Sequence, residues 1–161
     1  MDLFTRLIAD NIQPPRGMAW HGGPTPSGAL RNVDVEAARW RPRPDRHTIW
    51  ELALHSAYWN YAVRRRLLGR RGPRFPRSPA NWPNVPRVRD DAAWVVDRAL
   101  VAEQQRLLVE TIRSFPGGKL GRSVGSGKRW TWGDLLIGIA MHDAYHAGQI
   151  QLMKRLWRTR R

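Results

Sequence analysis

Apolar residues recur at three- and four-residue steps along the C-terminal segment, residues 131–161. This spacing places them on one face of an α-helix, and no proline interrupts the run. The pattern therefore predicts one long amphipathic helix that packs this face against a core. The positions that define the face are Leu135, Ile139, Ile150 and Met153.

The same periodicity predicts three further long helices. The first covers residues 1–12 and ends before two prolines. The second runs from Thr48 to Gly69, because Thr48 and Glu51 form a T-x-x-E capping box and the glycine is suited to a helix C-terminus. The third covers residues 90–115, where acidic residues at the start favour a helix N-terminus.

Two stretches rich in proline and glycine, residues 16–30 and 70–86, lie between these helices and predict long loops. A short helix is predicted over residues 33–40. No segment shows the alternation of a β-strand. The sequence therefore predicts an all-α fold, a four-helix bundle with long connecting loops that forms a single domain over residues 1–161.

The composition limits which kinds of functional site the chain can form. The 161 residues include no cysteine, which excludes disulfides, thiolate zinc sites and cysteine nucleophiles. Neither a leader peptide nor a membrane span is predicted, so a soluble cytoplasmic protein is expected. The net charge of +15 suggests a nucleic-acid partner, but the arginines are scattered along the chain and a GC-rich coding sequence would produce them. A basic nucleic-acid-binding module therefore stays the disfavoured alternative.

Three of the five histidines lie on inward faces of two predicted helices. His142 and His146 are four residues apart, about 40° around and about 6 Å along a helix, so both rings can face one ion. His55 lies on an otherwise apolar face of the helix that starts at Thr48. Three histidines are the ligand set of a catalytic zinc-type site, which leaves a position for water or substrate. Histidines that merely bond to polar neighbours are the alternative.

The sequence assigns no catalytic residue. Asp143 follows His142 where a zincin has glutamate, so the H-E-x-x-H motif is absent. Asp143 is expected, in order of preference, to be a cap, a surface charge or a hydrogen-bond partner of a metal ligand. His21 lies in a glycine-rich loop and is a candidate for a catalytic or ligand role, although a role in packing the loop is favoured. His47 directly precedes the capping Thr48 and is expected to be solvated.

The segments that carry the three histidines resemble the DinB/YfiT-like superfamily of metal-dependent enzymes. The run HDAYHAGQIQLMKR is similar to the family's H-x-x-x-H followed by G-Q-I, and IWELALHSAYWNYAVRRRL is similar to its single histidine in an apolar helix. The AWHGGP loop and the WTWGDLL helix entry resemble the family as well. The resemblance implies an up-down-down-up four-helix bundle with a divalent ion on His55, His142 and His146.

The resemblance also implies a class of reaction. The superfamily includes S-transferases and isomerases that use low-molecular-weight bacterial thiols, so a metal-dependent hydrolase or thiol S-transferase acting on a small molecule is expected. The expected cofactor is a divalent ion, Zn or Ni by preference, although imidazole ligands also suit Co and Fe. A relative that binds metal for stability alone is the third possibility. The apolar helix surfaces leave room for a homodimer.

Overall fold

The computed structural model describes residues 2–15, 17–18, 23–125, 127 and 129–160. In this part of the chain all regular secondary structure except one isolated bridge is helical. The all-α fold is therefore confirmed. The long helices are α1 (Leu3–Ile12), α4 (Ile49–Leu67), α5 (Asp91–Arg113) and α6 (Trp132–Thr159), and the short ones are α2 (Pro26–Ala29), α3 (Val35–Arg39) and the 3-10 turn η1 (Gly117–Lys119).

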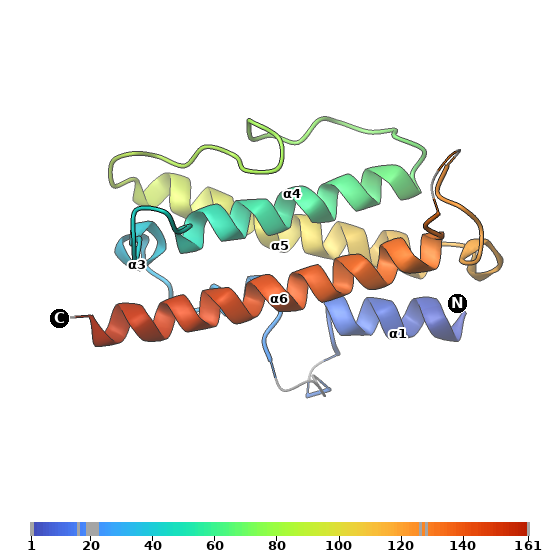
Figure 1. The fold of residues 1–161 in the computed structure, drawn as a ribbon, viewed down its shortest axis with the longest axis horizontal. Helices are drawn as coiled ribbons and strands as arrows, with labels where there is room; N and C mark the ends of the chain where they lie inside the picture. The colour runs from blue at the N-terminus through green and yellow to red at the C-terminus, as the bar shows by residue number, and fades with distance from the viewer. Residues whose placement is uncertain (1, 16, 19–22, 126, 128, 161) are drawn as a thin grey trace.

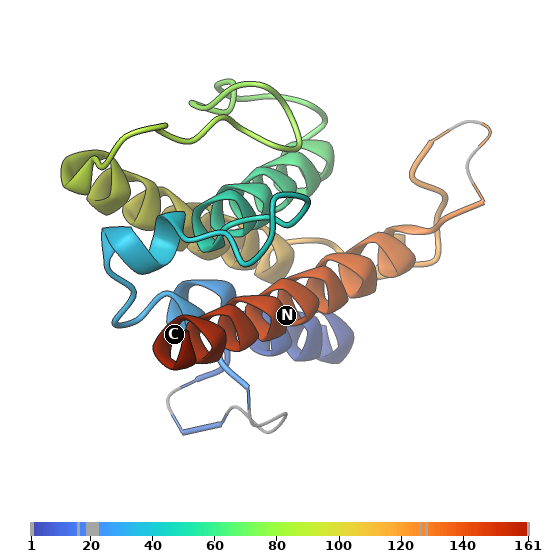
Figure 2. The ribbon, with the colours of Figure 1, turned by 60° about the vertical axis from the view of Figure 1, so that its left-hand side comes forward.

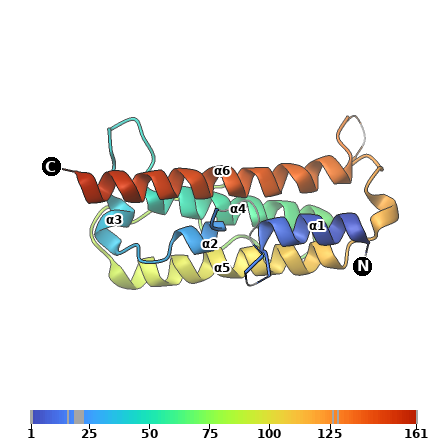
Figure 3. The same cartoon turned by 90° about the horizontal axis from the view of Figure 1, so that it is seen from below.

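The four long helices occupy the corners of a bundle. α4 packs against α5 and α6, and α1 packs against the same two helices from the other side. α1 and α6 run in one direction along the bundle, and α4 and α5 run in the opposite direction (Figure 1). The short α2 lies beyond α1 between α5 and α6, so it extends the corner that the ten-residue α1 leaves incomplete (Figure 3). This is the predicted four-helix bundle.

α2 lies in a stretch that the sequence predicted to be a loop. The Thr25 hydroxyl accepts from the backbone amide of Gly28, and Pro26 occupies the first turn, where its missing N–H costs nothing. Thr25 and Pro26 therefore mark the beginning of a short helix here. The predicted short helix over 33–40 is present as α3.

Both histidine-bearing helices begin at a capping box. The amide of Glu51 donates to the Thr48 hydroxyl at 3.1 Å, and the Glu51 carboxylate accepts from the Thr48 amide at 2.8 Å. Thr131 and Asp134 form the same pair at the start of α6, again at 3.1 and 2.8 Å. The two boxes fix where each helix begins, and with it the register of the histidines.

Because α4 and α5 are parallel, the chain between them must return along the whole bundle. This connection arches over the outside of α4 (Figure 2). The sequence predicts a long loop here, and the structure shows that its side chains Phe75, Trp82 and Val85 pack against the core. The loop therefore covers the face of α4 that carries His55.

The core consists of two clusters of buried side chains. One surrounds Trp50 and Leu54 of α4 together with Ile150 of α6, and the other surrounds Val63 of α4 together with Leu136 of α6. The middle turns of α4 and α6 lie between the clusters. No helix in the described residues is long and apolar enough to cross a membrane.

Candidate metal centre

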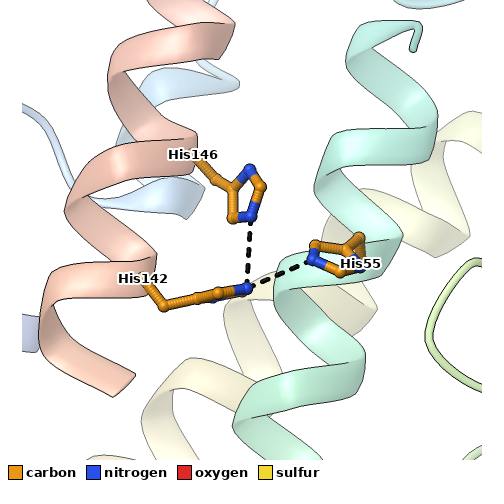
Figure 4. Close-up of side chains that lie close together, drawn as sticks. All are labelled: His55, His142 and His146. Carbon is orange, nitrogen blue, oxygen red and sulfur yellow. Dashed lines mark hydrogen bonds between the residues drawn. The ribbon is translucent and has the colours of Figure 1, made fainter. Parts of the chain in front are cut away.

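The side chains of His55, His142 and His146 meet where the second turn of α4 faces the middle turns of α6 (Figure 4). The Nε2 atom of His142 lies 3.2 Å from Nε2 of His55 and 3.1 Å from Nε2 of His146. No two of the candidate ligand nitrogens are more than 4.8 Å apart, and within the described residues this is the one cluster of at least three side chains that could hold a metal ion.

The neighbours of two rings determine which nitrogen carries the proton. Nδ1 of His55 lies 2.8 Å from the backbone carbonyl oxygen of Asn81. Nδ1 of His146 lies 2.7 Å from Oε1 of Gln149, whose amide nitrogen donates to the Tyr145 hydroxyl. Since both oxygens only accept, each Nδ1 is the donor and each Nε2 carries a lone pair. Both lone pairs are directed toward His142.

The protons on the three rings cannot satisfy both short nitrogen contacts. Nε2 of His142 carries at most one proton, so it can donate to His55 or to His146 but not to both. The other ring would then direct its lone pair at a nitrogen 3.1 or 3.2 Å away that offers it no hydrogen. A cation among the rings would satisfy all three nitrogens. The arrangement is therefore better suited to a cation than to a closed hydrogen-bond network.

Burial keeps two of the rings uncharged. The pKa of His55 is lowered to about 4, mainly because burial removes hydration from the charged form, and repulsion from His142 lowers it further. The pKa of His146 is lowered to about 4 by the same two causes. The hydrogen bonds to Asn81 and Gln149 oppose only part of this shift. At neutral pH both lone pairs are therefore free to bind a metal ion.

The spacing of the nitrogens suits a single ion. Imidazole nitrogens about 2.0–2.1 Å from a tetrahedral zinc ion are roughly 3.3–3.4 Å from each other, close to the two short contacts. His55 and His146 are buried, whereas the His142 side chain is 25% exposed. One side of the cluster is therefore reachable from solvent. Nickel and cobalt also accept imidazole ligands, and the cluster does not choose among these metals.

The sequence matches the family profile described as the DinB superfamily over residues 27–150, a segment that includes all three histidines. The match covers more than half of the chain. The chain belongs to the DinB superfamily. Comparisons with curated proteins and with solved structures give no significant match. The resemblance to this superfamily that the sequence predicted is thus confirmed, and the histidine cluster of this DinB chain lies within the matched segment.

Behind His142 the DinB bundle buries a carboxylate. Asp143 is only 2% exposed, and Oδ1 lies 3.9 Å from Nδ1 of His142. Neither carboxylate oxygen has a hydrogen-bond partner among the described residues, and the same holds for Nδ1 of His142 and the side-chain amide of Asn60. Burial raises the pKa of Asp143, and His142 and Asn60 oppose that shift. The first two expectations for Asp143, a cap and a surface charge, are therefore wrong, because the side chain faces the bundle interior.

The loop between α4 and α5 packs against the His55 ring and positions it. The sequence does not predict these contacts. The indole of Trp82 stacks on His55 with ring centroids 3.9 Å apart, and its other face stacks on His47 at 3.7 Å. The side chain of Asn81 accepts from Nε1 of Trp59 at 2.8 Å, while its backbone accepts from His55. His47 is therefore packed on an indole rather than simply solvated. Nothing local in the sequence pairs residues 81 and 82 with α4.

A cavity of about 510 Å³ opens beside the cluster. Its lining is mostly apolar, and His142 is the one member of the cluster that contributes to it. His21, the candidate loop histidine, lies outside the described residues. The lining residues are Trp59, Val63, Arg66, Trp130, Asp134, Leu135, Gly138, Ile139 and His142.

Proposed function

We propose that this DinB chain is a metal-dependent enzyme that binds one divalent ion on His55, His142 and His146 and acts on a small molecule by hydrolysis or S-transfer. The observation that carries the proposal is the convergence of three Nε2 atoms that their own protons cannot satisfy. The adjoining cavity, which His142 lines, supports a catalytic use of this centre.

Each part of the site has a separate task in this proposal. A bound divalent ion supplies Lewis acidity, which lowers the pKa of a coordinated water or thiol. His55 and His146 stay neutral because they are buried, and their Nδ1–H donors hold the rings in place. The apolar wall, which includes Trp59 and Ile139, excludes water from the bound molecule and places its reactive atom beside His142.

Two features favour an enzyme over a protein that uses metal for stability alone. Structural zinc sites are closed by four protein ligands, whereas catalytic sites have three and leave a position for water or substrate. Here three histidines converge, and the most exposed of them borders the cavity. The disfavoured alternative, a nucleic-acid-binding module with structural histidines, does not account for two lone pairs that are directed at one nitrogen of His142.

Turnover assays with and without metal test the proposed function. Protein stripped by a chelator and then reloaded with Zn, Ni or Co would be assayed for hydrolysis of aryl esters and for addition of small thiols to an electrophilic fluorophore. We expect at least one activity that appears on reloading and is lost in His142→Ala. If reloaded wild type binds the ion but turns over no faster than the stripped protein across the panel, the ion is structural.

A further inference from the structure

The cavity beside His142 has an uneven lining that bears on the substrate. Four apolar side chains, Trp59, Val63, Leu135 and Ile139, form most of the wall together with Trp130 and Gly138. Arg66 and Asp134 are the lysine, arginine, aspartate or glutamate side chains of this lining. A ligand that fills this space must therefore have an apolar body, and these two side chains decide what charge it can bear.

The two charged side chains are not equally available to a ligand. Oδ2 of Asp134 accepts from the backbone amide and from the hydroxyl of Thr131, both at 2.8 Å. These hydrogen bonds lower the pKa of Asp134 and keep its charge at the N-terminus of α6. Arg66 is exposed, and no carboxylate of the described residues pairs with it, in contrast to Arg77, which pairs with Asp97. Arg66 is thus the free charge of the cavity.

A second hollow of about 500 Å³ adjoins the first. The two share Arg66, Trp130 and Leu135, and the second adds Arg70 and Trp132. We call the first hollow, which is lined by both His142 and Arg66, the groove; Arg66 lies about three turns along α4 from His55. An oxyanion is the group that the planar guanidinium of arginine binds best.

We infer that this groove binds an amphiphilic organic anion. An aromatic or aliphatic body lies between Trp59 and Ile139 with its reactive end at His142, and a carboxylate, sulfonate or phosphate pairs with Arg66. The inference rests on the proposed function in that it gives the substrate class of the same centre. The binding step itself needs no metal, so the two can be tested apart.

A glycine in the wall allows the groove to be blocked without damage to the helix. A Cβ added at Gly138 would meet nothing within 4 Å, so a leucine there would extend into the open cavity. Leucine is also the better helix former, by up to about 1 kcal/mol. Gly148 in the same helix is equally free of contacts and does not line the cavity, so Gly148→Leu is the matched control.

The test compares two fluorescent probes that differ mainly in one charge: 8-anilinonaphthalene-1-sulfonate and the uncharged N-phenyl-1-naphthylamine. Wild type should bind both saturably. Arg66→Gln should weaken binding of the sulfonate about tenfold and leave the neutral probe unchanged, because a hydrogen-bonded charge pair is worth about that factor. Arg64→Gln, on the same helix but outside both hollows, should bind both probes as wild type does. Gly138→Leu should abolish binding of both probes, and Gly148→Leu should not.

Two other patterns of probe binding would contradict the inference. Equal loss of both probes in Arg66→Gln would show that the arginine shapes the groove rather than pairing with an anion. Sulfonate binding that survives Gly138→Leu would be adsorption to the basic surface. The titrations are run on metal-free and metal-loaded protein with the ion measured in each sample. Probe binding by protein that never holds a stoichiometric ion would contradict the proposed function and support anion binding in the groove. A stoichiometric ion without probe binding would support the metal site and contradict anion binding in the groove.

Discussion

At the scale of single residues, the orientation of each imidazole follows from what lies behind it. His55 and His146 each donate Nδ1–H to an oxygen that can only accept. His142 has a buried carboxylate, Asp143, at 3.9 Å instead, which is too long for a hydrogen bond. A small movement of either side chain on metal binding would close this distance. Carboxylates in this position orient a metal-binding histidine and make it more basic.

The first prediction is therefore that Asp143→Asn weakens metal binding by about 10- to 100-fold. Competition with a chromophoric chelator measures the affinity. Asp91→Asn, an exposed change at the start of α5, is the control and should leave the affinity unchanged. The melting temperature of metal-free Asp143→Asn should not fall, since the change removes a buried carboxylate without hydrogen-bond partners. Wild-type affinity in Asp143→Asn would show that the carboxylate plays no part in the centre.

The lowered pKa values predict how the metal-free protein responds to acid. The folded-state pKa of His55 and His146 is about 4, below the unfolded value near 6.5, so the unfolded chain binds more protons between these limits. These rings therefore contribute stability that is complete above about pH 6.5 and is lost as the pH falls toward 4. The raised pKa of Asp143 acts in the opposite direction.

Urea denaturation of metal-free wild type and of the double variant His55→Gln, His146→Gln isolates the histidine contribution. The unfolding free energy of wild type minus that of the variant should fall as the pH falls from 6.5 to 4. A difference that stays constant over this range would mean that the two rings titrate normally in the folded state.

At the scale of helices and loops, the elements that could be predicted are those with local signals. The capping boxes at Thr48 and Thr131 and the helical periodicity after each one placed His55, His142 and His146 on inward faces, and the structure has all three there. The Asn81 acceptor, the Trp82 stack and the burial of Asp143 could not be predicted. They depend on where the chain returns in space, which no local pattern encodes.

At the scale of loops, we predict that the loop between α4 and α5 contributes to metal affinity. Trp82→Ala removes the indole that stacks on His55 and admits water to the ring, so metal affinity should fall by about tenfold. Trp82→Phe keeps an aromatic face and should retain most of the affinity. The same competition assay applies. Equal affinity in the alanine variant and in wild type would show that the loop only covers the centre and does not position it.

At the scale of the whole molecule, the histidine cluster joins two helices between two hydrophobic clusters. α4 and α6 are held together on either side of it by apolar contacts, so the cluster is largely formed before any ion binds. The homodimer stays a prediction. Exposed apolar side chains on α1 and α6 agree with it, among them Phe4, Leu7, Ile137 and Met141.

An ion that binds across α4 and α6 stabilises the folded state in proportion to the logarithm of its concentration. At 100 times the dissociation constant the gain is about 2.7 kcal/mol. The melting temperature of wild type should therefore rise steadily with added Zn or Ni, and that of His142→Ala should not. A rise of the same size in both proteins would place the stabilising ion elsewhere on the chain.

The central claim is that three imidazoles from two helices hold one divalent ion, and metal stoichiometry tests it most directly. Wild type, His55→Ala, His142→Ala, His146→Ala and the control His47→Ala would be purified with metal, dialysed and analysed for bound ion by mass spectrometry. Wild type and His47→Ala should carry one ion per chain, and the other three variants should carry almost none. Wild type without a stoichiometric ion, or variants of the three cluster histidines that still hold one, would contradict the account.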